Sequence, residues 1–217
     1  MIKVTRSTEP VILQKKGAEW TEKLRCATTR KEREKALNRY RHPQVRHALE
    51  VMFHGKCAYC ESKILHVDYG HIEHFRPKSN PRFAHLIFAW SNLLLACPRC
   101  NGTENKGDKF PEIEEGGPLV NPCEDDPEEH LQFEYDASTR VASVYGKTPR
   151  GQLTEQLLGL NRYHLRARRS NFVKKLAYVA GKAEDDIEAR ALLTDAAKDD
   201  GEYAAFARKL MTKVGIC

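Results

Sequence analysis

The sequence lacks any apolar run that approaches the roughly 18 residues needed to span a bilayer. It also lacks internal repeats and low-complexity tracts, and its start, MIKVTRSTEP, contains no apolar signal-peptide core. With 41% hydrophobic and 30% charged residues, its composition is that of an ordinary globular protein of one large or two small domains. We therefore expect a cytoplasmic protein without membrane contact.

One stretch of the sequence lacks basic residues, and the stretch after it almost lacks acidic residues. Residues 112–139 carry 10 acids and no Lys or Arg, whereas residues 140–182 carry 10 Lys or Arg and a single acid, Glu155. Residues 1–56 are also basic, with 14 Lys or Arg against 6 acids. The basic segments suit a polyanionic partner such as a nucleic acid, although solvated helix faces explain them equally well.

Cysteine is neither abundant nor even in number, and a reducing compartment argues further against a disulfide framework. Three of the seven cysteines are scattered and are predicted to be ordinary thiols: Cys26, Cys123 and Cys217. The other four form two Cys-x2-Cys pairs: Cys57 with Cys60, and Cys97 with Cys100.

The two pairs predict one structural zinc ion, because a two-residue gap lets two thiolates reach an ion from one turn. The alternative to a metal site is four unrelated buried cysteines. A redox pair would need a thioredoxin-like context that the sequence lacks. A finger of Cys57, Cys60, His71 and His74 is disfavoured because its histidine gap is too short. The four cysteines therefore leave both histidines available for other work.

The segment between and just after the cysteine pairs contains Glu73, His74, Asn92 and Asn101. Hydrolysis of a phosphodiester needs a base that activates water and a cation that stabilises charge on the phosphate. A hard cation such as Mg²⁺ prefers oxygen ligands, which a glutamate and an asparagine can offer.

Three motifs, IEHFRPKS, WSNLLLACPRCN and NKGDKF, make this region resemble the zinc-bearing HNH endonucleases. The resemblance implies a ββα-metal fold around one catalytic Mg²⁺ or Mn²⁺. It also implies that His74 is the general base, that Glu73 and Asn101 bind the cation, and that Asn92 orients the loop around the base. In the family the end of this motif reads Cys-Asn-x2-Lys, whereas here Lys106 follows Asn101 two positions later than that spacing. Asn105 is therefore an alternative to Asn101 as the second ligand of the cation.

Purely structural roles remain alternatives for several of these residues. Asn92 can be a turn or helix cap, and His74 a hydrogen-bonded core histidine. His71 falls on the strand face opposite His74 and is either a partly exposed residue or a supporting group near the phosphate. Three cations are expected to contact DNA: Arg76, Lys78 and Lys106.

Further stretches extend the resemblance to the HNH proteins found with retrons and in Septu-type anti-phage systems, the PtuB-like subfamily. These include STEPVIL, GKCAYCESKI, DDPEEHLQF and LLGLNRYHLRARR. The resemblance implies a DNA substrate, an ABC-type ATPase (PtuA-like) partner and a role in phage defence. A zinc-stabilised nucleic-acid-binding or adaptor module without catalysis is the alternative function.

Hydrophobic periodicity supplies the remaining expectations about fold. We expect an α+β protein: a ββα-metal core with a four-cysteine zinc site, embedded in a mostly helical chain with an extra β-hairpin. Short strands are expected across residues 56–75, the hairpin across 130–146, and a basic face of Arg162, Arg166 and Arg169 on a helix that binds DNA or the partner. The expected segments are a helical region (1–55), the nuclease core (56–111), an acidic loop with the hairpin (112–147) and a helical region (148–217).

Overall fold

The computed structural model describes residues 1–216, and Cys217 lies outside the described residues. The described chain is α+β and divides into two compact units. The β1–β2 unit comprises residues 5–57 and 64–110, and the β3–β4 unit comprises residues 1–4, 58–63 and the chain from Pro111 onward. No helix within residues 1–216 is long and apolar enough to cross a membrane.

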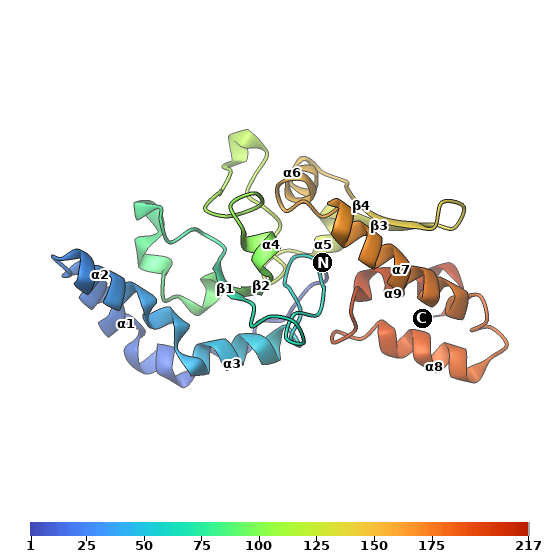
Figure 1. The fold of residues 1–217 in the computed structure, drawn as a ribbon, viewed down its shortest axis with the longest axis horizontal. Coiled ribbons are helices and arrows are strands. Elements are labelled where there is room, and N and C mark those ends of the chain that lie inside the picture. The colour runs from blue at the N-terminus through green and yellow to red at the C-terminus, as the bar shows by residue number, and fades with distance from the viewer. Residues whose placement is uncertain (217) are drawn as a thin grey trace. The chain divides into compact units, whose positions relative to one another are not determined.

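The β1–β2 unit begins with helices and continues with a small sheet (Figure 1). Its helices before the sheet are α1 (Val11–Arg25), α2 (Arg30–Leu37), the 3-10 turn η1 (Asn38–Arg41) and α3 (Pro43–Met52). The sheet pairs β1 (His71–His74) with β2 (Leu93–Ala96), and α4 (Pro98–Asn101) follows. Two further 3-10 turns lie between the strands: η2 (Pro81–Leu86) and η3 (Trp90–Asn92).

Helix α3 forms as its sequence predicts. Pro43 occupies the first turn, where its missing N–H costs nothing, and the His42 ring accepts a hydrogen bond from Gln44 N. The apolar face of Val45, Leu49 and Met52 is buried, which drives the helix onto the sheet.

Strands β1 and β2 are antiparallel, with His71 opposite Ala96 and His74 opposite Leu93. All four residues of β2 are buried, so the strand forms the centre of this unit. Gly70 precedes β1 with a φ of +66°, a conformation that side chains rarely adopt, and it turns the chain into the strand. The strand expectation across 56–75 is correct only at His71–His74, since Cys57–Cys60 forms a turn instead.

The β3–β4 unit contains the predicted hairpin, which pairs β3 (Leu131–Asp136) with β4 (Val141–Gly146) (Figure 1). Its other elements are η4 (Ile113–Glu115), α5 (Pro127–His130), α6 (Pro149–Leu157), α7 (Tyr163–Ala180), α8 (Ile187–Ala196) and α9 (Ala204–Lys213). Helices α6 and α7 pack on β4, and α9 packs on β3. Helices are therefore the main regular structure of the described residues, alongside two small sheets.

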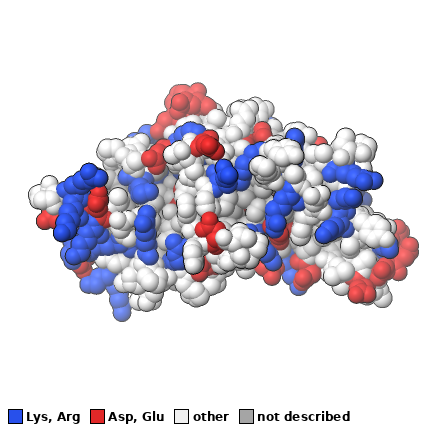
Figure 2. All heavy atoms as spheres, viewed as in Figure 1, with Lys and Arg blue, Asp and Glu red and all other residues white. Residues whose placement is uncertain are grey.

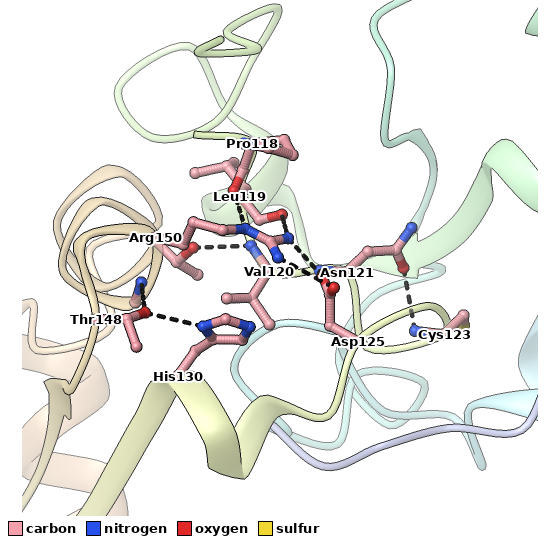
Figure 3. Close-up of polar contacts among 11 residues, drawn as sticks. Pro118, Leu119, Val120, Asn121, Cys123, Asp125, His130, Thr148 and Arg150 are labelled. Atoms are coloured by element: carbon pink, nitrogen blue, oxygen red, sulfur yellow. Dashed lines mark hydrogen bonds and ion pairs between the residues drawn. The ribbon is translucent and has the colours of Figure 1, made fainter. Parts of the chain in front are cut away.

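The loop before α5 is fastened by one arginine (Figure 3). Arg150 donates to both carboxylate oxygens of Asp125, at 2.7 and 3.2 Å. The same guanidinium donates to the carbonyls of Pro118 and Leu119. The acidic stretch is thus held in place by a cation from α6.

The basic face expected on α7 is not a single exposed face. Arg166 is exposed, but Arg169 is only 2% exposed. Its guanidinium donates to the carbonyls of Ala142 and Leu160 and to Asn161 Oδ1. Arg169 therefore belongs to the core, because backbone carbonyls of β4 and the α6–α7 turn need a donor there.

Basic side chains gather over α1 and α2 (Figure 2). Many of them are paired with acids one turn away, such as Arg25 with Glu22 and Arg30 with Glu34. These are exposed helix pairs of the kind that contributes a few tenths of a kcal/mol.

Candidate active site

His74, at the end of β1, is only 4% exposed. Its Nε2 lies 3.0 Å from the Ile87 carbonyl, and because a carbonyl only accepts, Nε2 must carry the proton. The other ring nitrogen, Nδ1, is buried and has no hydrogen-bond partner among the described residues. Burial lowers the pKa of His74 to about 4, partly opposed by the bond to Ile87, so the ring is neutral at pH 7 with a lone pair on Nδ1.

Asn92 holds the backbone that follows His74. Its Oδ1 accepts from Arg76 N at 2.7 Å, and its Nδ2 donates to the carbonyls of Arg76 and Leu86. Asn92 is 1% exposed, so these bonds form away from water. The side chain therefore connects two loops that flank the histidine.

Glu73 is 3% exposed and forms an ion pair of 2.6 Å with Lys106. Lys106, which was expected to contact DNA, is itself fully buried and also donates to the His74 carbonyl at 3.0 Å. Lys106, which follows Asn101 two positions later than the family motif has it, therefore reaches the buried carboxylate of Glu73.

Asn101 ends α4 and is half-buried. Its Nδ2 lies 3.4 Å from His71 Nδ1, so the two side chains meet within hydrogen-bonding distance. His71 is exposed and shares the β1 face of Glu73, which is two residues away. Asn105 instead donates to the Arg99 carbonyl at 2.8 Å and satisfies the end of α4.

A cavity of about 350 Å³ lies in the β1–β2 unit beside β1. Asn101 and His71 line it, together with Lys78 and three residues from η1 and α3: Tyr40, Arg41 and Arg46. Tyr40 is buried and packs edge-to-face on the His74 ring, with centroids 4.6 Å apart. The helices that precede the sheet thus contribute a wall of the site.

Two of the three cations expected to contact DNA are half-buried and in contact with aromatic rings. The Arg76 guanidinium lies 5.8 Å from the Phe75 ring and 5.7 Å from the Phe110 ring. The Lys78 ammonium lies 5.7 Å from the Tyr40 ring. Both keep their charge near the site while their stems are packed.

The four predicted metal-binding cysteines come together. The Sγ atoms of Cys57, Cys60, Cys97 and Cys100 all lie within 4.8 Å of one another. Cys97 also caps α4 by accepting a hydrogen bond from Cys100 N at 3.4 Å. Such a compact set of soft ligands can hold one metal ion.

The sequence interpretation missed the wall formed by Tyr40, Arg41 and Arg46. They lie about thirty positions before His71 and match none of the motifs. The only available signal was the basic and aromatic run NRYRHPQVR, residues 38–46, which the helical periodicity accounted for.

The donor types present fit a hard divalent cation. Glu73 offers a carboxylate on the β1 face that His71 shares, and the Asn101 amide lies beside His71. Oxygen donors of this kind suit Mg²⁺ or Mn²⁺ rather than a soft metal.

Comparisons with known proteins match this region to a described family. The family model described as HNH endonuclease matches residues 57–107. A Septu protein PtuB of Bacillus mycoides (strain KBAB4) is 33% identical over 204 residues, which cover 81% of this chain and 68% of that protein. A second Septu protein PtuB, from Bacillus thuringiensis, is 35% identical over 55% of this chain and 42% of that protein.

A retron protein is also similar to this chain. The HNH protein of retron Vc95 from Vibrio cholerae serotype O1 biovar El Tor is 28% identical, over 62% of this chain and 66% of that protein. No solved structure matches. The similarity to PtuB therefore extends well beyond the 51 residues of the HNH match.

Proposed function

The chain belongs to the Septu PtuB family of HNH endonucleases, and we propose that it hydrolyses phosphodiester bonds in DNA with a divalent cation held by Glu73 and Asn101. The observation that carries the proposal is the state of His74. Its ring is fixed through Nε2 to the Ile87 carbonyl, and its Nδ1 is left as an acceptor without a hydrogen-bond partner among the described residues.

His74 is assigned as the general base. A general base must be unprotonated, correctly oriented and within reach of the attacking water. Burial keeps the ring neutral, the carbonyl of Ile87 selects the tautomer, and the ring of Tyr40 limits its rotation. Asn92 supports this arrangement by holding the loop that carries Ile87.

Glu73 and Asn101 are assigned as the ligands of the catalytic cation. When bound, Mg²⁺ or Mn²⁺ stabilises negative charge on the phosphate and on the leaving oxygen. Lys106 holds the Glu73 carboxylate through the ion pair of 2.6 Å. Asn105 is the weaker choice because its amide already serves the end of α4.

The four-cysteine cluster is assigned to a structural zinc ion. Zinc favours four thiolates in a closed tetrahedral site, and the two Cys-x2-Cys turns supply them. The ion would fix the Cys57–Cys60 turn to the start of α4, and Asn101 directly follows the last cysteine. Arg76 and Lys78 are assigned to DNA phosphates.

The biological role proposed is that of the nuclease in an anti-phage system, acting with an ABC-type ATPase of the PtuA kind. Support comes from the similarity to Septu PtuB and to a retron HNH protein. The division of the chain into segments 1–55, 56–111, 112–147 and 148–217 also remains a proposal, as does a cytoplasmic location.

A plasmid nicking assay tests the proposed chemistry. The wild-type chain, alone and co-purified with the neighbouring ATPase, is expected to nick DNA with Mg²⁺ or Mn²⁺ and not with EDTA. His74→Ala should abolish nicking, whereas His66→Ala, which changes an exposed loop histidine, should not. Nicking that survives His74→Ala would remove the base assignment, and DNA binding without nicking in every arm would favour the adaptor alternative.

A further inference from the structure

The cavity beside β1 carries more positive charge than its surroundings neutralise. Arg41, Arg46 and Lys78 line it, and no carboxylate does so within residues 1–216. Arg46 is used locally, because it donates to the carbonyls of Tyr69 and Gly70 and lies 3.9 Å from Glu50. The charges of Arg41 and Lys78 therefore need a different explanation.

Arg41 and Lys78 are both held against the ring of Tyr40. The Arg41 guanidinium lies 5.5 Å from the ring centroid, and its Nε donates to the Tyr40 hydroxyl at 3.1 Å. The Lys78 ammonium lies 5.7 Å from the same centroid. Neither side chain forms an ion pair with another described residue, so one buried ring fixes two cations whose charges repel.

Such an arrangement favours an anion that both cations can reach. A guanidinium offers a planar fork of donors and an ammonium offers a point charge, and both are common phosphate ligands. The other wall of the same cavity contains His71 and Asn101, and Asn101 is a ligand assigned to the catalytic cation. The anion would thus sit next to the reacting phosphate.

We propose that Arg41 and Lys78, positioned by Tyr40, form a subsite for a DNA phosphate adjacent to the one that is cut. The inference rests on the proposed nuclease function and adds residues from outside the 57–107 match. A cavity of about 350 Å³ has room for a nucleotide-sized group. The helices before the sheet therefore take part in substrate binding, and Tyr40 acts as a positioning residue.

A flanking phosphate is bound equally in the ground state and in the transition state. Losing that contact raises KM and leaves kcat nearly unchanged, whereas losing the base lowers kcat. Each lost phosphate contact also reduces the salt dependence of binding by about one counterion. These signatures separate a phosphate subsite from a merely structural role.

The test measures binding of a short fluorescein-labelled DNA duplex, in buffer without divalent cations and across a range of salt concentrations. The double variant Arg41→Ala/Lys78→Ala is expected to bind roughly tenfold more weakly or worse, with a salt slope smaller by about two. Lys31→Ala, which removes an exposed cation from α2, is the matched control and should bind as the wild type does. Double-variant binding within twofold of wild type, or no wild-type binding at all, overturns the proposal.

Tyr40 is tested by two substitutions. Tyr40→Phe keeps the ring and loses only the hydroxyl bond to Arg41, so it should retain most of the affinity. Tyr40→Leu removes the ring and should weaken binding about as much as the double variant, while the unfolding transition confirms a folded chain. Equal affinity of the Leu and Phe variants would exclude the positioning role.

The outcomes for the subsite and for the nuclease are distinguishable. If the double variant binds weakly but no arm nicks DNA, the subsite stands and the nuclease proposal fails. If the double variant binds and cleaves with the wild-type KM while His74→Ala is inactive, the nuclease stands and the subsite fails.

Discussion

The carboxylate of Glu73 and the ammonium of Lys106 form an ion pair of 2.6 Å in which both side chains are shielded from water. A buried pair contributes little net stability, but removal of one partner leaves an uncompensated charge in a poorly solvating environment. We therefore expect Lys106→Met to destabilise the fold by about 3 kcal/mol or more, as measured by urea unfolding.

A double substitution provides the control for this pair. Glu73→Gln/Lys106→Met removes both charges, so it should be clearly less destabilising than Lys106→Met alone. If the losses in Glu73→Gln and in Lys106→Met simply add in the double variant, the two charges do not interact. Glu73→Gln should also lose nicking activity, because Glu73 is assigned to the cation.

The four-cysteine cluster predicts about one tightly bound zinc ion per chain, which elemental analysis of freshly purified protein can count. Cys57→Ser should abolish the bound zinc and lower the unfolding midpoint, because structural zinc contributes folding free energy. Cys26→Ser changes an exposed cysteine outside the cluster and should retain both. Zinc content that is unchanged in Cys57→Ser would contradict the assignment.

The four cysteines were predictable because short-range spacing fixes how thiolates approach an ion, and that rule does not depend on the rest of the fold. The hairpin of residues 131–146 and helix α3 were predictable for a similar reason, since alternation and helical periodicity are local signals. The wall of Tyr40, Arg41 and Arg46 was not, because which helix packs on β1 depends on tertiary contacts that no local pattern encodes. Lys106 was misplaced at the surface for the same reason: a lysine signals exposure until its carboxylate partner is known.

Asn92 offers a prediction about loop rigidity. Its side chain makes three hydrogen bonds to backbone groups of the loops that flank β1. Asn92→Ala leaves those buried groups without a partner and should cost about 2 to 4 kcal/mol in urea unfolding. Asn92→Asp keeps the acceptor for Arg76 N but loses both donated bonds, so it should not restore stability. A variant of wild-type stability would show that water replaces the amide.

The pH dependence of stability follows from His74. Its pKa is lowered to about 4 in the folded chain, mainly by burial, against an ordinary value of 6.5. Between these values the unfolded chain binds more protons, so stability should rise with pH from about 4 to 6.5 and then level off. The expected contribution is about 3 kcal/mol, since each pKa unit corresponds to about 1.4 kcal/mol.

Unfolding measured across this pH range, without added divalent cations, checks the prediction. His74→Gln should flatten the slope relative to the wild type, whereas His66→Gln, in an exposed loop, should keep the wild-type slope. An unchanged slope in His74→Gln would mean that other groups dominate acid unfolding.

Helix α7 allows a contrast between two arginines of similar sequence context. Arg169 donates to the carbonyls of Ala142 and Leu160 and lies 5.2 Å from the Phe206 ring. Arg169→Met should therefore leave these buried carbonyls without a hydrogen-bond donor. We expect a loss of about 3 kcal/mol or more in urea unfolding, because the acceptors lose a charged donor.

Arg166 is exposed, and Arg166→Met should change stability by less than about 0.5 kcal/mol. If DNA or the ATPase binds this helix, Arg166→Met should weaken that binding without unfolding the chain, which makes it the informative variant for the surface of α7. Equal stability of the two variants would mean that the carbonyls of β4 find other donors when the guanidinium is removed.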